Sequence, residues 1–201
     1  MALTRAKAAL LPIVAVGVLP MRAAVRMSGS GALIAADVAR WVDCIDRDIV
    51  RELSESRQFD YLVSALPEFR CLLRHRTESA PRWVRVVVSI LYRHDRSMVL
   101  DSPEIGPGFF IQHGNGMKVS AERIGSNCFI NQWATVGYTD HGRPTIGDDV
   151  RIGPGAVVVG PVTLHDGCRI GPNVVIVEDV PAGTIMTAAE PVARIRRTHR
   201  T

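Results

Sequence analysis

The chain has 201 residues, of which 47% are hydrophobic and 22% are charged. This balance is typical of a globular protein with a buried core and excludes an intrinsically disordered chain. The formal net charge is +4, and nucleic-acid binders usually have a denser basic face, so we expect no nucleic-acid partner. Cys44, Cys71, Cys128 and Cys168 form no CxxC pair. Their spacing fits reduced thiols in a cytoplasmic protein better than a disulfide framework or a zinc site.

Residues 1–27 combine two early basic residues with an apolar stretch. Arg5 and Lys7 followed by apolar residues resemble a secretory signal, but Pro12 and Pro20 interrupt the stretch and no clear cleavage site follows. The stretch is also too short to predict a transmembrane helix. We interpret 1–27 as an N-terminal extension. The sequence leaves open whether it is ordered, a targeting segment or the product of a start codon placed too early.

Residues 28–98 have apolar positions at helical spacing. Val38, Trp41, Val42 and Ile45 recur three and four residues apart, which predicts one face of an amphipathic helix. The sequence therefore predicts a helical region over 28–98.

Two prolines indicate where further helices of this region begin. Pro67 and Pro81 each precede an apolar segment, and proline is favoured in the first turn of a helix. The β-branched run Val86–Val88 leaves a strand open as an alternative after Pro81.

From residue 99 the helical period gives way to a period of six. The regular pattern is interrupted by a ten-residue step between Val136 and Ile146, and a weaker extension runs upstream through Met117 with one residue inserted before Ile124. An aliphatic residue recurs at Ile124, Ile130, Val136, Ile146, Ile152, Val158, Leu164, Ile170 and Ile176.

A period of six predicts a β-helix. Three short strands joined by tight turns close a triangular coil of about 18 residues, in which the aliphatic residue points inward and stacks on the next coil. Stacked coils bury the core that one coil cannot bury alone. We therefore predict an α+β chain with a β-helix over 99–185 and a C-terminal tail over 186–201. Four extra residues within 138–144 must leave the coil as a loop.

Four segments and the chain's ending carry a family resemblance over residues 99–196. They resemble the hexapeptide-repeat acyltransferases, most closely those of the serine acetyltransferase type, and the PEFRCLLRHR segment resembles the helices that precede the β-helix there. The resemblance implies a left-handed β-helix, acetyl-CoA bound between neighbouring β-helices, and a homotrimer, possibly a dimer of trimers. The segments are IGPGFFIQHGNGMKV (105–119), INQWATVG (130–137), RPTIGDDVRIGPGAVVVGPV (143–162), IGPNVVIVEDVPAGT (170–184) and EPVARI (190–195).

His113 is the candidate catalytic base. It occupies the position that the resemblance assigns to the family's general base, and an imidazole that titrates near neutrality suits removal of a hydroxyl proton. Gly114 and Gly116 leave room for ligands beside it. The family's carboxylate partner corresponds to Met98, so Asp101, three residues later, is our substitute candidate. We expect direct transfer, because no cysteine lies in a nucleophile motif.

Three residues are candidates for binding the acceptor. The resemblance places a His and an Arg near the acceptor in the loop over 138–144, where this chain has His141 and Arg143. Serine acetyltransferases have an acidic residue directly before the base, but this chain has the neutral Gln112 there. A neutral residue loses a charge-assisted bond to the serine ammonium group. The sequence therefore leaves L-serine and a sugar open as acceptors.

Small residues are candidates for contact with CoA. Gly153, Gly155, Ala156 and Gly171 would let pantetheine lie against the coil wall, and Arg194 in the basic tail would meet the phosphates. The histidines lack zinc-ligand spacing, so we expect no metal.

The sequence thus predicts an acetyl-CoA-dependent O-acetyltransferase that acts on L-serine or a related small molecule. The alternatives are a sugar or polysaccharide-precursor O-acetyltransferase and, in another class, a non-catalytic β-helix trimerisation scaffold.

Overall fold

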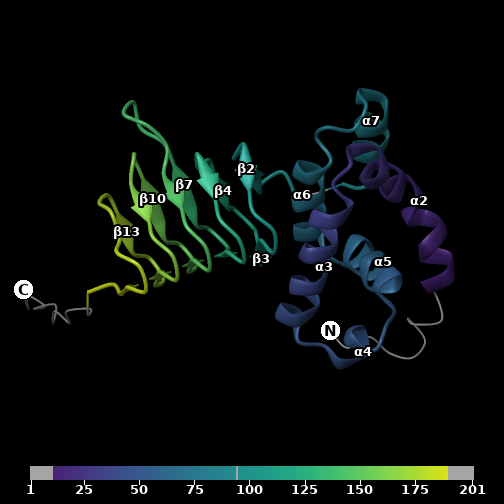
Figure 1. The fold of residues 1–201 in the computed structure, drawn as a ribbon, viewed down its shortest axis with the longest axis horizontal. Helices are drawn as coiled ribbons and strands as arrows, with labels where there is room; N and C mark the ends of the chain where they lie inside the picture. The colour runs from purple at the N-terminus through teal and green to yellow at the C-terminus, as the bar shows by residue number, and fades with distance from the viewer. Residues whose placement is uncertain (1–10, 94, 190–201) are drawn as a thin grey trace, which may run out of the picture.

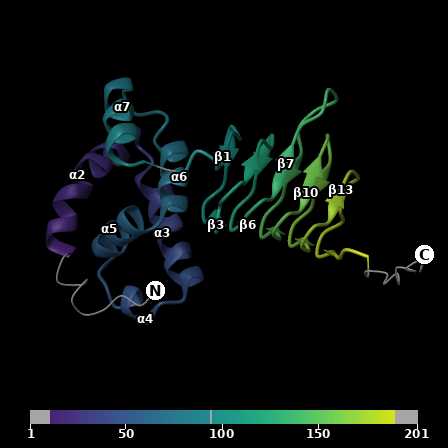
Figure 2. The same ribbon diagram turned by 180° about the vertical axis from the view of Figure 1, so that it is seen from behind.

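The computed structural model describes residues 11–93 and 95–189, which form a set of helices beside one end of a β-helix (Figure 1). The same order of regions is visible from behind (Figure 2). The helices are α2 (Leu11–Ser28), α3 (Gly31–Ile45), α4 (Asp48–Arg51), α5 (Glu55–Ala65), α6 (Pro67–Arg76) and α7 (Arg82–Leu91).

Helix α2 includes much of the segment whose order the sequence left open. Met21 and Ala24 are buried, and the Arg22 guanidinium donates to an Asp60 carboxylate oxygen 2.7 Å away on α5. These contacts make α2 part of the helical core, so the helices of this region begin before residue 28. Among the described residues, no helix is long and apolar enough to cross a membrane.

Helix α7 contains the β-branched run that left a strand open as an alternative. Val84 and Val88 are buried, whereas Val86 is 49% exposed. A strand would place all three side chains on one face, but a helix places only the residues four apart together. The strand alternative is therefore wrong, because packing of one helical face outweighs the weak helix propensity of valine.

The second region confirms the predicted left-handed parallel β-helix, since successive strands visit three sheets in turn. Face A contains β1 (Val99–Leu100), β4 (Lys118–Val119), β7 (Thr135–Gly137), β10 (Val157–Val159) and β13 (Val175–Ile176). Face B contains β2 (Glu104–Ile105), β5 (Arg123–Ile124), β8 (Thr145–Ile146) and β11 (Thr163–Leu164). Face C contains β3 (Phe110–Gln112), β6 (Phe129–Asn131), β9 (Arg151–Ile152), β12 (Arg169–Ile170) and β14 (Ile185–Met186).

The core of the β-helix follows the predicted period, with one correction. From Ile124 onward the repeating aliphatic residues are buried and pair with their counterparts one coil away, as Ile130 does with Ile152. Upstream, Val119 pairs with Val136, so Val119 takes the strand position that the sequence analysis gave to Met117. The period failed there because the preceding turn is longer than the others.

A buried ion pair joins the two regions. Arg76 on α6 donates through Nε to the Asp37 carboxylate on α3 over 2.8 Å, and both side chains are almost fully buried. The same guanidinium donates to the carbonyls of Ile105 and Gly106, and the Gly108 N–H donates to Asp37 over 2.7 Å. The bonds to Ile105, Gly106 and Gly108 therefore tie the helices to the first coil.

Candidate active site

The predicted site residues lie along two edges of the β-helix, and both edges border face A. We call the turns that lead from face C to face A the base edge; they comprise residues 113–117, 132–134, 153–156 and 171–174. We call the turns that lead from face A to face B the loop edge; they comprise residues 101–103, 120–122, 138–144 and 160–162.

His113 begins an unusually long turn on the base edge. Gln112 pairs with Asn131 and Lys118 pairs with Thr135, so five residues, 113–117, lie opposite three residues, 132–134, in the next coil. The two extra residues form a bulge, and His113 adopts a φ of +52° at its start. Its carbonyl accepts the Asn115 N–H over 2.7 Å. The side chain is exposed, so an incoming hydroxyl can reach the imidazole.

The residues on either side of His113 in the chain, Gln112 and Gly114, are neutral. The Asn131 amide donates to the Gln112 side-chain oxygen over 3.1 Å. Met98, at the position that the resemblance gives to a carboxylate, is buried. Its Sδ lies where a Cβ on Gly114 would come within 2.5 Å. The apolar Met98 therefore supports the bulge by packing.

Trp133 is a site candidate that the sequence analysis missed. It lies one coil after His113 on the base edge, is 66% exposed and adopts a φ of +60°. The backbone N–H of Trp133 donates to the Asn115 carbonyl over 2.9 Å. The Trp133 indole covers Gly116, where a Cβ would come within 2.3 Å of the ring. A bulky tryptophan in the left-handed region is an outlier, and the equivalent positions of the next two turns hold Gly155 and Asn173. A tryptophan at this turn position is the sequence feature by which Trp133 could have been found.

The residues predicted to contact CoA lie further along the base edge. Gly153, Gly155 and Ala156 form the turn in the third coil, and Gly171 begins the turn in the fourth. Gly155 has a φ of +67°, and a Cβ there would come within 2.2 Å of the Asn173 side-chain oxygen. With coils about 4.8 Å apart, this edge extends about 14 Å from the turn of His113 to that of Gly171. Arg194 lies outside the described residues.

The loop edge brings Asp101 and Arg143 together. Arg143 donates to the Asp101 carbonyl over 3.1 Å, and its guanidinium lies 3.8 Å from the carboxylate and 5.3 Å from the centre of the Tyr138 ring. Thr139 and Gly142 exchange backbone hydrogen bonds, which places the exposed His141 within a tight hairpin. Within one chain, Asp101 and Arg143 therefore lie across face A from His113.

A hollow of about 300 Å³ opens on this edge. Asp101 and Arg143 line it together with Glu122, Glu78 and His75. Burial lowers the pKa of His75 below its usual value, so this imidazole stays neutral more readily than a solvated one. The hollow thus presents three carboxyl groups and one guanidinium.

Burial disfavours the thiolate form of two cysteines. Burial raises the pKa of Cys71 to about 11 and that of Cys128 to about 12. Thiols with such pKa values stay protonated at neutral pH, and the thiolate is the nucleophilic form. Neither thiol therefore suits an acyl-enzyme mechanism. Among residues 11–93 and 95–189, no group of three His, Cys, Asp or Glu side chains is arranged to hold a metal.

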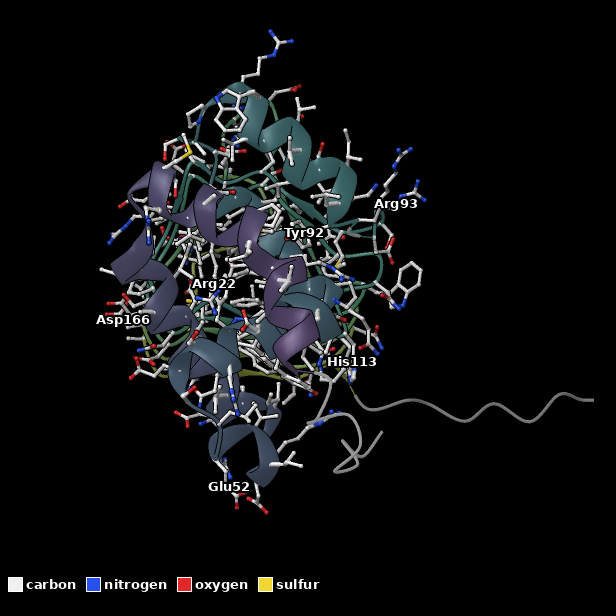
Figure 3. The ribbon with its side chains drawn as sticks, turned by 90° about the vertical axis from the view of Figure 1, so that its right-hand side faces the viewer. Arg22, Glu52, Tyr92, Arg93, His113 and Asp166 are labelled. Atoms are coloured by element: carbon white, nitrogen blue, oxygen red, sulfur yellow. The ribbon has the colours of Figure 1, made fainter. Side chains whose placement is uncertain are left out.

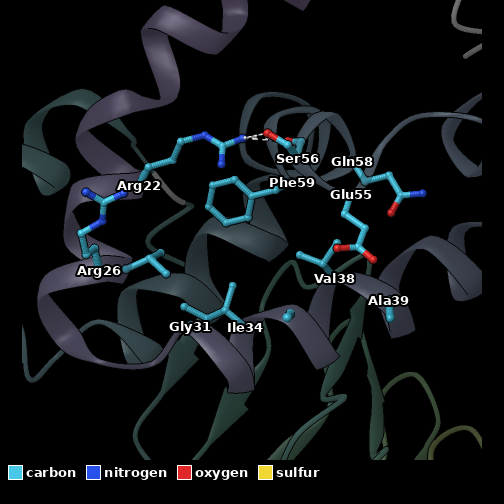
Figure 4. Close-up of a pocket in the computed structure, with 12 residues that line it drawn as sticks. Arg22, Arg26, Gly31, Ile34, Val38, Ala39, Glu55, Ser56, Gln58 and Phe59 are labelled. Atoms are coloured by element: carbon cyan, nitrogen blue, oxygen red, sulfur yellow. Dashed lines mark hydrogen bonds between the residues drawn. The ribbon is translucent and has the colours of Figure 1, made fainter.

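A cavity of about 610 Å³ lies between α2, α3 and α5, away from both edges (Figure 4). Ile34, Val38 and Phe59 give it an apolar wall, and Arg22 at its side donates to Ser56 over 2.8 Å. None of the residues predicted from the sequence lines this cavity.

Comparison with known proteins identifies the repeat and the fold. Residues 143–178 match the family model described as "Bacterial transferase hexapeptide (six repeats)". No curated protein has a significant sequence match to the chain.

Several solved structures of serine acetyltransferases are similar to this chain. Isoform 3 from Entamoeba histolytica, in complex with cysteine, has a TM-score of 0.60 at 22% identity, and the match covers 85% of this chain and 62% of that one. The soybean apoenzyme has a TM-score of 0.56 at 25% identity over 75% of this chain and 62% of that one. The Neisseria gonorrhoeae enzyme has a TM-score of 0.59 at 21% identity, and the match covers 85% of this chain and 69% of that one.

The chain therefore spans about three fifths of the length of the Entamoeba and soybean enzymes. Residues 143–178 thus carry hexapeptide repeats of the bacterial transferase type, and the chain has the left-handed β-helix fold seen in the serine acetyltransferases.

Proposed function

We propose that the protein is an acetyl-CoA-dependent O-acetyltransferase with His113 as its general base. The observation that carries the proposal is the exposed His113 on a lengthened turn, at the head of the edge that also holds the predicted CoA contacts. His113 would take the acceptor proton as the hydroxyl oxygen attacks the thioester carbon. When the C–S bond breaks, the imidazolium would return a proton to the departing thiolate. The protonated, buried thiols favour this direct transfer over an acyl-enzyme.

We infer a homotrimer in which the three copies turn face A toward a common axis. Val157 and Val159 point outward from this face, and Val175 is 63% exposed and Val177 62% exposed in the protomer. Burial of this apolar surface would stabilise the assembly. Threefold packing is heterologous, so the base edge of one copy would meet the loop edge of the next. Pairing of two trimers through the helices remains a prediction.

This arrangement would complete the active site. It would bring His113 of one subunit near Asp101, His141 and Arg143 of its neighbour, which one chain keeps apart. Gly153, Gly155, Ala156 and Gly171 would line the groove for CoA, with Arg194 beyond them. The free cysteines fit a cytoplasmic location.

L-serine or a related amino acid is the first acceptor candidate. The hollow on the loop edge presents the carboxyl groups of Asp101 and Glu122 beside the Arg143 guanidinium. These groups would pair with the ammonium and the carboxylate of an amino acid. They would supply the charge that Gln112 lacks.

A sugar or polysaccharide precursor is the second acceptor candidate, and Trp133 favours it. Its exposed indole lies one coil from His113, and an aromatic ring offers a broad, largely apolar contact surface with a polar end. The Gln112–Asn131 amide pair would hydrogen-bond neutral hydroxyls. The two acceptor candidates therefore depend on opposite edges of the site.

The decisive test is an acceptor screen with acetyl-CoA that measures released thiol for L-serine, homoserine, nucleotide sugars and simple glycosides. We expect turnover on one class, reduced about 10²- to 10⁴-fold in His113→Ala. Trp133→Ala would raise KM for a sugar, whereas Asp101→Asn would raise KM for serine. Absence of both turnover and CoA binding by calorimetry would leave the trimerisation scaffold.

Subunit complementation tests the shared site. His113→Ala and Arg143→Ala are each expected to lose activity. When the two variants assemble together in equal amounts, each mixed trimer would contain one intact site, so activity recovers to about a quarter of wild type. No recovery in verified mixed trimers would contradict a site built from two subunits.

A further inference from the structure

Helix α7 has apolar residues on two sides, and only one side is covered. Val84 and Val88 face the other helices and are buried. Trp83, Val86, Val87 and Ile90 recur at spacings of three and four, and they are 65%, 49%, 39% and 68% exposed. Residues at these spacings lie on one face of a helix. We call these four residues the α7 stripe.

Arginines accompany the α7 stripe without acidic partners on the same helix. Arg82 and Arg85 lie on α7, which contains no Asp or Glu. They line a pocket of about 240 Å³ together with Arg70 and Arg74 of α6, and Glu78 is the single acidic residue in its lining. Among residues 11–93 and 95–189, none of these four arginines forms an ion pair. The pocket thus collects positive charge beside an apolar surface.

Within the part of the chain that the structure describes, Arg70, one of the residues that line this pocket, has long hydrogen bonds only: its Nη1 donates to the carbonyls of Val63 and Ser64 over 3.4 and 3.5 Å. The Nε of Arg70 is buried and has no hydrogen-bond partner among the described residues. A buried donor without an acceptor costs about 1–3 kcal/mol. An anion in the pocket would supply acceptors for the guanidinium groups that line it, and phosphate oxygens are well suited to them.

We propose that α7 and this arginine pocket dock the protein on an anionic phospholipid bilayer. The α7 stripe would lie in the plane of the interface, with Trp83 and Ile90 at the boundary between headgroups and acyl chains. Arg82 and Arg85 would reach the headgroups while their aliphatic stems stay along the apolar surface. The pocket would hold the phosphate of one anionic lipid.

The position of α7 suits a flat partner. The helix lies at the outer edge of the helical region in both ribbon views, away from most of the β-helix (Figures 1 and 2). Just after the helix, the exposed Arg93 points away from the body of the molecule, while Tyr92 lies toward it (Figure 3). A second copy placed on this face would bring like charges together, which opposes self-association. The charge therefore favours a negatively charged surface.

The test is co-sedimentation of the full chain with phosphatidylcholine vesicles, with and without 30% phosphatidylglycerol. We expect binding to the anionic vesicles alone, and a loss as salt rises. Ile90→Gln is expected to weaken partitioning about tenfold, and Arg82→Gln and Arg85→Gln about fivefold each. Ile185→Gln, at an isoleucine that is 63% exposed on the β-helix, is the matched apolar control. Arg57→Gln, at an exposed arginine of α5, is the charge control.

Tryptophan emission gives a second readout. In a Trp133→Phe background the exposed tryptophan is Trp83, since Trp41 is 1% exposed. Vesicle binding is expected to shift its emission to shorter wavelength. Equal binding to neutral vesicles, or equal effects of Ile90→Gln and Ile185→Gln, would overturn the proposal. So would concentration-dependent self-association that Ile90→Gln abolishes, or binding of an acidic polypeptide with no vesicle binding.

Discussion

The β-helix and the helical region reach a buried core by different routes. In the β-helix each aliphatic residue contacts its counterpart one coil away, so a local repeat specifies the packing, as with Ile130 and Ile152. The helical region contains no repeat, and its contacts join distant segments, as when Arg76 reaches Asp37 and the first coil. A repeat allows the buried positions to be predicted from the sequence. The core of the helical region depends on long-range contacts, which no local pattern predicts.

The candidate site lies where the repeat is interrupted. The lengthened turn at 113–117 holds His113, and the loop at 138–144 holds His141 and Arg143. Both interruptions leave the inward residues in place and change the turns alone. In the proposed function the regular coils would act as a rigid frame and the insertions would supply the reactive groups, as functional residues on loops of a rigid scaffold do.

The largest expected effect on stability concerns the buried Asp37–Arg76 ion pair, which joins the helical region to the β-helix; we call this contact the joint. Asp37→Ala removes the acceptor for Arg76 and Gly108 and leaves a buried guanidinium, which should lower the free energy of unfolding by about 3–5 kcal/mol. Urea unfolding followed by tryptophan emission would measure this loss. Asp43→Ala, at an exposed position of the same helix, should change stability by less than about 0.5 kcal/mol. A loss below about 1 kcal/mol in Asp37→Ala would contradict a structural role for this ion pair.

A cavity in the β-helix core is expected to have the next largest effect. Leu164 on face B is fully buried, so Leu164→Ala should lower the free energy of unfolding by about 3 kcal/mol. Urea unfolding of purified protein measures this loss, and Thr163→Ala at the adjacent outward position is the control. If the two variants were equally stable, the repeat would not carry the packing that we assign to it.

Overfilling a turn should have a smaller effect. Ala156 on the base edge is fully buried, and Ala156→Leu should lower the free energy of unfolding by about 1–3 kcal/mol. Thr163→Leu, the same kind of enlargement at an outward position, is the comparison. Unchanged stability of Ala156→Leu would mean that this turn has room that the structure does not contain.

The smallest expected effect is a pH dependence from the helical side of the joint. His75 Nε2 lies 2.9 Å from the Ser102 carbonyl, and burial lowers its pKa. As pH falls through the unfolded-state pKa near 6.5, the unfolded chain binds a proton that the folded chain does not. The free energy of unfolding should therefore fall on acidification, by at most about 1.4 kcal/mol per pH unit. Urea unfolding at pH 5.5 and 7.5 would measure the slope, and an equal slope in His75→Gln would contradict this assignment.

The sequence by itself determined the β-helix, because a period of six admits one repeated packing in which the same position is always inward. It also indicated the loop at 138–144, since four extra residues cannot fit a regular coil. The prediction of His113 as the catalytic base rests on its Gln-His-Gly-Asn-Gly surroundings and on the family resemblance. The serine acetyltransferase fold was recognisable for the same reason.

The tertiary structure alone decided which turns share an edge. It placed Asp101 with Arg143 and apart from His113, because residues twelve apart in a coil of about 18 fall on different corners of a triangle. It moved the strand position from Met117 to Val119, and it brought Trp133 to the turn beside His113. It also decided the helical joint, since the partners Asp37, Arg76 and Gly108 are far apart in sequence and no local pattern links them.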